Sequence, residues 1–243
     1  MKKAQILSIL VVTLFLFSIT VNAKDKKGKK EVTVEDVMDS YIEAIGGKEA
    51  LDKLKDFTIT QKVTVPGGEI KTVTKQINEE DRFLVMIETY MNDMLVRKTI
   101  STPDTFTFIA PQGTQKVAGI QAKVLNQTAS LVIEQSYPVT GIKPVLIGTE
   151  KINGKTLHHV AATYGSGATF HSYYDAETGL KTYIGVPSGD EGSVTEATDY
   201  QKMGDTVMFP FKMVNPDNTT KNITITEVTD VIVNQGLKAE DLK

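Results

Sequence analysis

The hydrophobic pattern of this sequence begins with the spacing of a helix and then follows, for most of its length, the alternation of strands. Over residues 34–45 the apolar side chains recur at helical spacing, at Val34, Val37, Met38, Tyr41, Ile42 and Ile45. Thr33 and Asp36 form a capping-box pattern before this stripe, and Gly46-Gly47 offers a left-handed stop after it. Residues 48–54 predict a second short helix. Two helices are therefore expected to open the folded part.

From Phe57 onward apolar and polar residues alternate, which is typical of strands with one solvated face. Residues 117–135 interrupt this alternation with apolar residues at helical spacing and predict a third helix with a wide apolar face. Most connections are short, which favours an antiparallel meander that curls to shield its apolar face. We predict a mainly β (α+β) fold, a single curled antiparallel sheet of about eleven strands with two or three helices. The expected strands are 57–65, 69–77, 82–90, 94–101, 105–109, 156–164, 168–175, 180–187, 193–202, 206–214 and 220–233.

The first 23 residues have the pattern of a secretory signal peptide. Lys2 and Lys3 precede an apolar run over residues 6–17, and Val21-Asn22-Ala23 leads to a cleavage point after Ala23. A transmembrane anchor is the competing interpretation, but the run is short for a span of about 20 residues. The sequence has no cysteine, which excludes a disulfide framework, a thiolate nucleophile and a cysteine lipid anchor. We therefore expect an exported chain that is not lipid-anchored.

The formal net charge of −3 averages two unlike segments. Residues 24–32 form a lysine-rich leader, whereas residues 31–243 carry 20 basic against 29 acidic residues. Such a leader is either a solvated flexible segment or a contact for an anionic membrane surface. The acidic balance gives no reason to expect nucleic acid as a partner. The leader lysines are Lys24, Lys26, Lys27, Lys29 and Lys30.

The residues that could support catalysis form no known constellation. If the hairpin after residue 163 centres on Ser166, residue 161 lies opposite 171 and 159 opposite 173, which makes His159 and His171 diagonal neighbours. That register places no carboxylate beside them as a third metal ligand, so we expect no metal and no cofactor. Asp175 and Glu177 lie in one turn, where carboxylates more often cap backbone N–H groups than form a hydrolase pair. No catalytic residue is therefore assigned.

Several phrases together resemble the outer-membrane lipoprotein carrier and receptor superfamily, as a divergent LolA/LolB-like periplasmic protein. The resemblance covers residues 33–243 and depends on the order and spacing of turn phrases that are individually weak. Similar phrases occur in extensions of pitrilysin-type zinc peptidases, but this sequence contains no such metal-binding histidine motif. The phrases are 41–50 followed by 54–57, 147–155, 173–181, 199–204 leading to Phe209-Pro210, and 231–234.

The resemblance implies an unclosed half-barrel whose helices plug the concave face and enclose an apolar space for acyl chains. A strand over residues 82–90 is apolar on both faces, so either face could line that space. The family is known for a basic strand residue that helps to govern lid closure, and Arg97 is the candidate for that gating role. The candidate lining residues are Phe83, Val85 and Ile87, or Leu84 and Met86 of the opposite face, with Phe106, Phe108, Val124 and Leu131.

These observations lead to one main hypothesis and two alternatives. The main hypothesis is a non-enzymatic periplasmic protein that binds a lipid or a lipoprotein acyl chain. The first alternative is an interaction module for an envelope protease or assembly complex, which predicts an exposed apolar or edge-strand surface. The second is a hydrolase, which requires a carboxylate and a histidine to converge in one cleft.

Overall fold

The computed structural model describes residues 31–65, 67–79, 82–128, 130–137, 141–163, 167, 169–185, 194–205, 207–216 and 223–243. The predicted signal peptide and residues 24–30 of the leader lie outside these ranges, so cleavage and the membrane contact of the lysines stay predictions. The residues from Val32 to Lys243 form one compact unit. In the described part of the chain, no helix has both the length and the apolar character needed to cross a membrane.

The helices open the unit as the sequence predicts. Helix α1 (Val34–Ala44) begins with a capping box, in which Asp36 N donates to Thr33 Oγ1 over 3.1 Å and Thr33 N donates to Asp36 Oδ2 over 3.0 Å. Gly46 and Gly47 both have positive φ, which ends α1 and starts α2 (Gly47–Lys53). The remaining helical elements are α3 (Ile120–Thr128) and the 3₁₀ turns η1 (Ile133–Ser136) and η3 (Ala239–Leu242).

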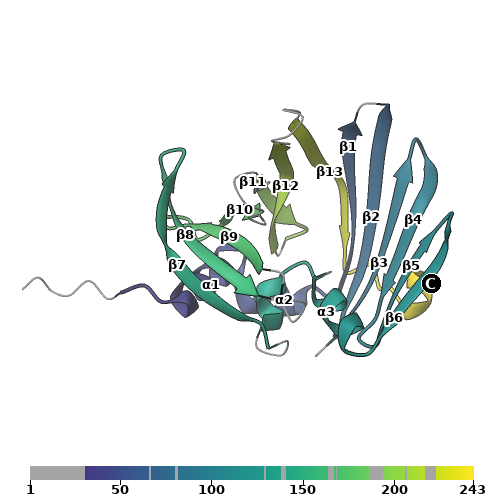
Figure 1. The fold of residues 1–243 in the computed structure, drawn as a ribbon, viewed down its shortest axis with the longest axis horizontal. Coiled ribbons are helices and arrows are strands. Elements are labelled where there is room, and N and C mark those ends of the chain that lie inside the picture. Colours follow the sequence, from purple (N-terminus) through teal and green to yellow (C-terminus); the bar gives the residue numbers. More distant parts are fainter. Residues whose placement is uncertain are drawn as a thin grey trace, which may run out of the picture. The chain divides into compact units, whose positions relative to one another are not determined.

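The strands form one antiparallel sheet of thirteen strands in the order β6-β5-β4-β3-β2-β1-β13-β12-β11-β10-β9-β8-β7 (Figure 1). The first strand pairs with the last, so two series of hairpins join at β1 and β13. Strands β6 and β7, which are consecutive in the sequence, are the two edges. The bounds are β1 (Asp56–Val65), β2 (Gly68–Glu79), β3 (Arg82–Met91), β4 (Met94–Ser101), β5 (Thr105–Ala110), β6 (Gly113–Ala118), β7 (Lys143–Ile152), β8 (Lys155–Thr163), β9 (Thr169–Asp175), β10 (Lys181–Gly185), β11 (Val194–Met203), β12 (Val207–Pro216) and β13 (Ile223–Val233).

The expected count of eleven strands is wrong by two, and both missed strands are edges. Residues 113–118 continue the hairpin from β5 as β6, so the predicted helix over 117–135 is shortened to α3 and the turn η1. Strand β7 contains Pro144 and Gly148, two residue types that are unfavourable inside a strand. An edge strand tolerates both, because proline there leaves no partner without a hydrogen bond and a bulge accommodates glycine.

The sheet curls, because one short segment contacts strands far apart in the strand order. Asn126 on α3 donates to Ser101 on β4, and Glu134, eight residues later, pairs with Lys181 on β10. Strands β4 and β10 are separated by seven strand spacings, which would be about 34 Å in a flat sheet. Eight residues span at most about 29 Å. The described residues between 119 and 142 (119–128, 130–137 and 141–142), hereafter the crossing segment, therefore lie on the concave face.

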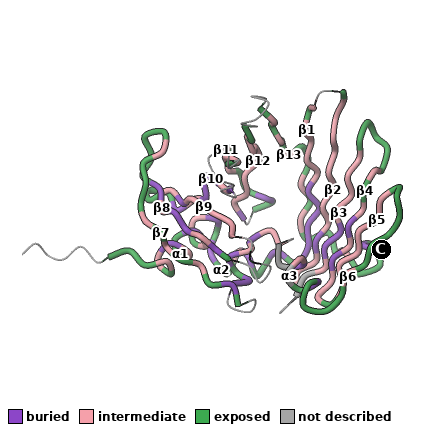
Figure 2. Tube along the Cα trace, in the orientation of Figure 1, coloured by how far each residue is buried: buried purple, intermediate pink, exposed green. Residues whose placement is uncertain are grey.

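The main core lies on that concave face, between the helices and the middle strands. It combines residues of α1 and α2 with inward residues of β1 and the later strands, and Figure 2 shows buried stretches of β1, β2 and β3 toward the end of the sheet near the helices. Its buried members are Val37, Tyr41, Ile45, Leu51, Leu54, Phe57, Ile59, Val132, Val160, Tyr174, Met203 and Val207.

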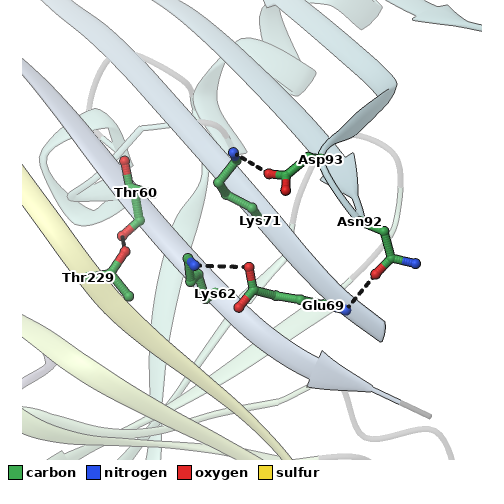
Figure 3. Close-up of polar contacts among 7 residues, drawn as sticks. All are labelled: Thr60, Lys62, Glu69, Lys71, Asn92, Asp93 and Thr229. Carbon is green, nitrogen blue, oxygen red and sulfur yellow. Dashed lines mark hydrogen bonds and ion pairs between the residues drawn. The ribbon is translucent and has the colours of Figure 1, made fainter. Parts of the chain in front are cut away.

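The convex face of β1, β2 and β3 is polar at one end and covered by the C-terminus at the other. Lys62 pairs with Glu69 over 2.9 Å and Lys71 with Asp93 over 3.0 Å near the strand ends (Figure 3). Such exposed pairs contribute little stability and keep this face solvated. At the other end η3 packs against β3, where Met86 is 2% exposed.

Side chains of β1 and β4 bind the main chain of the C-terminal segment. The Asp56 carboxylate accepts hydrogen bonds from the N–H groups of Gln235 and Gly236 over 2.9 and 3.0 Å. The Lys98 ammonium donates to the Lys243 carbonyl over 2.8 Å. Leu242 is 3% exposed as a result. The last residues of the chain are therefore part of the core on the convex face.

We expect Leu242→Ala to lower the free energy of unfolding by about 2–3 kcal/mol, because truncation of a buried leucine removes apolar contacts and leaves a cavity. Leu95→Ala is the matched control, since Leu95 is 49% exposed and should change stability by less than about 0.5 kcal/mol. Urea unfolding followed by circular dichroism measures both variants. Equal stability of the two variants would show that the C-terminal segment does not cover the sheet.

Candidate functional site

An apolar hollow lies between α3 and the edge of the sheet. It has a volume of ≈250 Å³ and is lined by residues from three elements. Strand β5 contributes two aromatic rings, β6 contributes an amide and a valine, and α3 contributes one leucine that faces them. The lining residues are Phe106, Phe108, Gln115, Val117 and Leu125.

Strand register explains why these residues share one face. Phe106 lies opposite Val117, and Phe108 lies opposite Gln115. On the other side Ser101 lies opposite Phe106 and Thr99 opposite Phe108. Paired residues of an antiparallel sheet point to the same face. The same row continues into β3, where Val85 lies opposite Ser101 and Ile87 opposite Thr99.

Helix α3 is attached to this face by a buried polar contact. Asn126 Nδ2 donates to Ser101 Oγ over 2.8 Å, and both residues are buried. Gln76, which lies opposite Val85 in the same row, donates its amide to Asn78 Oδ1 over 2.6 Å. Its own Oε1 atom is buried without a hydrogen-bond partner. The face beneath α3 thus combines apolar side chains with a few buried polar atoms, whose burial carries a free-energy cost.

A second attachment of the crossing segment is a buried ion pair. Glu134 of η1 pairs with Lys181 of β10, and the side chains are only 1% and 10% exposed. Tyr174 Oη donates to Glu134 Oε1 over 2.7 Å, and the Lys181 ammonium lies 4.9 Å from the centre of the Tyr41 ring. Among the described residues, Glu134 Oε2 has no hydrogen-bond partner. This cluster, hereafter the latch, holds the end of the crossing segment to the far half of the sheet.

Burial raises the pKa of each tyrosine around the latch. For Tyr41 and Tyr174 the pKa lies well above the ordinary value, because burial opposes the phenolate and the Glu134 carboxylate repels it. Burial likewise raises the pKa of Tyr200, whose hydroxyl donates to the Lys181 carbonyl over 2.7 Å. These three phenols stay protonated while the chain is folded.

The structure brings some of the predicted lining residues together and separates others. Phe106 and Phe108 line the hollow, and Val85 and Ile87 lie in the same row of the concave face. Leu131 packs against the main core instead. Whether any of these residues binds a ligand stays a proposal.

The remaining candidates lie elsewhere or are not described. Alternation along β3 places Leu84 and Met86 on the convex face, and η3 packs against that strand. The side chains of Phe83 and Val124 lie outside the described residues. The strand β3 is thus apolar on both faces because the helices cover one and the C-terminal segment the other.

Arg97, the candidate for gating, lies on the concave face of β4 beyond the hollow. It lies opposite Thr89 and donates to its hydroxyl over 3.4 Å. Four residues separate Arg97 from Ser101, which is about 13 Å along a strand. The side chain is exposed. Its gating role stays a prediction.

The sequence reasoning left Gln115, Val117 and Leu125 out of the candidate set. Gln115 falls in no predicted strand and Val117 falls in the predicted helix over 117–135, because the alternation over 113–118 is short and mostly polar. Leu125 lies within the predicted helix over residues 117–135, of which only Val124 and Leu131 are predicted to line the apolar space. A hairpin that pairs residues 113–118 with residues 105–110 through a turn at 111–112 is the signal that could have placed Gln115 and Val117 on a strand.

A second hollow lies on the opposite face of the later strands. It has a volume of ≈310 Å³ and includes Tyr173, Tyr183 and Glu196. Tyr173 alternates with Tyr174, whose ring packs against Tyr41 of α1, so the second hollow faces away from the helices. It is separate from the hollow beneath α3.

Comparison with known proteins identifies the fold. No family model matches the sequence, and no curated protein matches it. A putative outer membrane lipoprotein-sorting protein domain from Vibrio parahaemolyticus is 13% identical, with a TM-score of 0.59 over 85% of this chain and 97% of that chain. A LolA superfamily protein from Nitrosomonas europaea is 12% identical, with a TM-score of 0.57 over 88% of this chain and 98% of that chain. A DUF1329 family protein from Desulfovibrio piger is 12% identical, with a TM-score of 0.58 over 88% of this chain and 100% of that chain. The chain therefore has a LolA-like fold.

We expect Lys181→Met to lower the free energy of unfolding by about 3–5 kcal/mol, because the Glu134 carboxylate is left buried without its cation. Hydrogen exchange of residues 130–137 should accelerate, because they lose their attachment to β10. The double variant Lys181→Met/Glu134→Gln removes both charges and keeps an acceptor for Tyr174. It should lose less than half as much stability. A loss below about 1 kcal/mol for the single variant would contradict the latch.

The buried tyrosines predict a loss of stability at alkaline pH. Above about pH 10 tyrosines of the unfolded chain ionise, whereas Tyr41, Tyr174 and Tyr200 stay protonated in the folded chain. The unfolded state then binds fewer protons, so stability present below that pH falls by up to about 1.4 kcal/mol per pH unit for each tyrosine. Phenolate absorbance should show these groups ionising only as the chain unfolds. Ionisation of all eight tyrosines before unfolding would contradict the assigned burial.

Proposed function

We propose that this protein is a non-enzymatic, exported periplasmic protein of carrier or chaperone type, which binds the acyl chain of a lipid or lipoprotein beneath α3. The observation that supports this function best is the apolar hollow between α3 and strands β5 and β6. Pockets that bind small apolar ligands are lined mainly by apolar and aromatic side chains, as this one is. The LolA-like fold and the name of the lipoprotein-sorting neighbour agree with this class of function.

The volume of the hollow limits how much of a ligand it could hold. Sites for drug-sized ligands usually have about 300–1000 Å³, so ≈250 Å³ accommodates part of an acyl chain rather than a whole lipid. A longer chain would follow the row of Ile87 and Val85 along the concave face, which requires α3 to move outward. Ile120 at the start of α3 is 80% exposed, so the helix is loosely covered on its outer side. In this proposal α3 is the lid and the latch is its fixed end.

Arg97 has a place in the same proposal. A chain that enters beneath α3 leaves its polar end toward the β3–β4 turn, and Arg97 lies on that face about 13 Å from the α3 attachment. A guanidinium there would meet an anionic headgroup or carboxylate. This extends the gating role predicted from the sequence to recognition of the ligand's polar end.

A tryptophan that fills the hollow should weaken acyl binding. We expect Val117→Trp to weaken binding of a fluorescent fatty acid at least tenfold, because the indole occupies the space beneath α3. Lys116→Trp is the matched control, since Lys116 is exposed and alternates to the other face of β6. Circular dichroism checks that both variants are folded, and titration of the probe measures binding. Equal affinity of the two variants would contradict this site.

Native mass spectrometry of protein purified from the periplasm separates the main hypothesis from the interaction module. The proposal predicts a bound mass equal to a lipid or an acylated peptide, which is lost in Val117→Trp and kept in Lys116→Trp. A co-purifying protein without any acyl ligand would favour the interaction module. Its surface would be the edge strand β7, where Val145 and Ile147 are 54% and 56% exposed.

A further inference from the structure

The second hollow lies over one row of paired residues, on the face of the later strands that points away from the helices. Tyr183 lies opposite Tyr173 on one side and opposite Glu196 on the other, and Glu196 lies opposite Val214. The row continues to His159, which lies opposite Tyr173 as the sequence predicts. Paired residues of an antiparallel sheet point to the same face, so these side chains are neighbours. The other residues that line the hollow are Ile152, Asn153, Val194 and Pro216.

Two perpendicular tyrosine rings form one corner of this hollow. The ring centroids of Tyr173 and Tyr183 lie 6.4 Å apart, and the ring planes are inclined by 84°. The His159 ring stacks on Tyr173, with centroids 4.3 Å apart and planes inclined by 20°. His159 and Tyr183 lie on opposite sides of β9, so the face of Tyr173 that His159 leaves uncovered is turned toward Tyr183. The face of an aromatic ring carries negative potential and attracts cations.

Glu196 adds a negative charge that is not neutralised. Its half-buried carboxylate accepts a hydrogen bond from Tyr183 Oη over 3.4 Å. Within the described part of the chain, no ion pair joins Glu196 to a basic side chain. Lys212, two residues from Val214 and on the same face, pairs with Glu227 over 3.9 Å instead. The hollow therefore combines one unpaired carboxylate with apolar walls.

The two phenols are fixed and uncharged. Asn153 Nδ2 donates to Tyr183 Oη over 3.0 Å, and the same hydroxyl donates to Glu196. Burial raises the pKa of Tyr183, and the Glu196 carboxylate raises it further although the Asn153 amide opposes this. Burial and the Glu150 carboxylate likewise raise the pKa of Tyr173. Among the described residues that line the hollow, Glu196 is thus the one formal charge.

We propose that this hollow binds a small organic cation, whose methylated ammonium group lies against the rings of Tyr173 and Tyr183 and beside the Glu196 carboxylate. Aromatic faces recognise such cations, and the carboxylate supplies the opposite charge. The aliphatic walls suit N-methyl groups better than they suit the hydrogen-bonding hydration shell of a bare ammonium ion. A volume of ≈310 Å³ is at the lower end of ligand pockets, which run from about 300 to 1000 Å³, so the ligand is small. The site goes beyond the proposed acyl binding, because it lies on the opposite face of the sheet.

The test titrates the tag-free chain, without its predicted signal peptide, with choline and with the uncharged isostere of choline in which carbon replaces nitrogen (dimethylbutanol). The two probes have the same shape, so their difference isolates the charge. We expect choline to bind at one site per chain, measured by NMR shifts of its methyl groups and of the tyrosine rings. The isostere should bind at least about tenfold more weakly. No binding of choline, or equal affinity for both probes, would overturn the proposal.

Variants then assign the site. Glu196→Gln should weaken choline binding at least about tenfold, because the carboxylate is lost. Asp199→Asn is the matched control, since Asp199 lies on the same strand, bonds to Gln201 over 2.8 Å and does not line the hollow. Tyr173→Leu should weaken binding, whereas Tyr173→Phe, which keeps the ring face, should retain it.

Circular dichroism checks that each variant is folded, and the comparison of the two probes on the wild type does not depend on any variant. Equal affinity of Glu196→Gln and Asp199→Asn for choline would place the cation elsewhere and overturn the proposal. Binding of the fluorescent fatty acid should be unchanged in Glu196→Gln. Failure of either site is therefore distinguishable from failure of the other.

Discussion

The pairing of the first strand with the last is the constraint on which the rest of this structure depends. Without the β1–β13 ladder the chain would be two separate meanders, β1–β6 and β7–β13, each with an open edge at the middle. With it, one sheet forms and β1 becomes an interior strand whose first four residues are buried, with Phe57 0% exposed. The Asp56 carboxylate, which accepts from two N–H groups beyond β13, fastens the chain end to that strand. Contacts between parts of a chain that are distant in the sequence form slowly, because a long loop must close first.

The same constraint creates the site. Because β6 and β7 are consecutive in the sequence but lie at opposite edges, the crossing segment must pass over the face of the sheet. It is attached at both halves, by Asn126 to β4 and by Glu134 to β10, and the attachments differ in strength. A buried ion pair is costly to break by removal of one partner, whereas a single neutral hydrogen bond contributes about 1 kcal/mol. The crossing segment is therefore held firmly at the latch and more weakly at α3, beside the apolar hollow.

The sequence predicted what local patterns determine and missed what the sheet determines. The capping box at Thr33 and the register of His159 against Tyr173 follow from short-range rules, and both are confirmed. Strand β6 was missed because its polar residues acquire a face only when paired with Phe106 and Phe108. The sequence analysis places no carboxylate beside His159, whereas Glu150 Oε1 lies 2.6 Å from His159 Nδ1. The Asn153-Gly154 turn sets the register that brings Glu150 there, with Ile152 opposite Lys155 and Glu150 opposite Leu157. Leu131 lies in the core because the latch sets the path of the crossing segment, and periodicity alone contains no information on that contact.

Mapping the contacts of a bound acyl chain tests the central claim most directly. A photoreactive fatty acid is bound to the purified chain, crosslinked by light, and located by mass spectrometry of peptides. The account predicts labels on the β5–β6 hairpin, residues 105–118, and on α3, and it predicts that an unlabelled fatty acid competes them away. Labels confined to the opposite face, around Tyr173 and Tyr183, would contradict a binding site beneath α3.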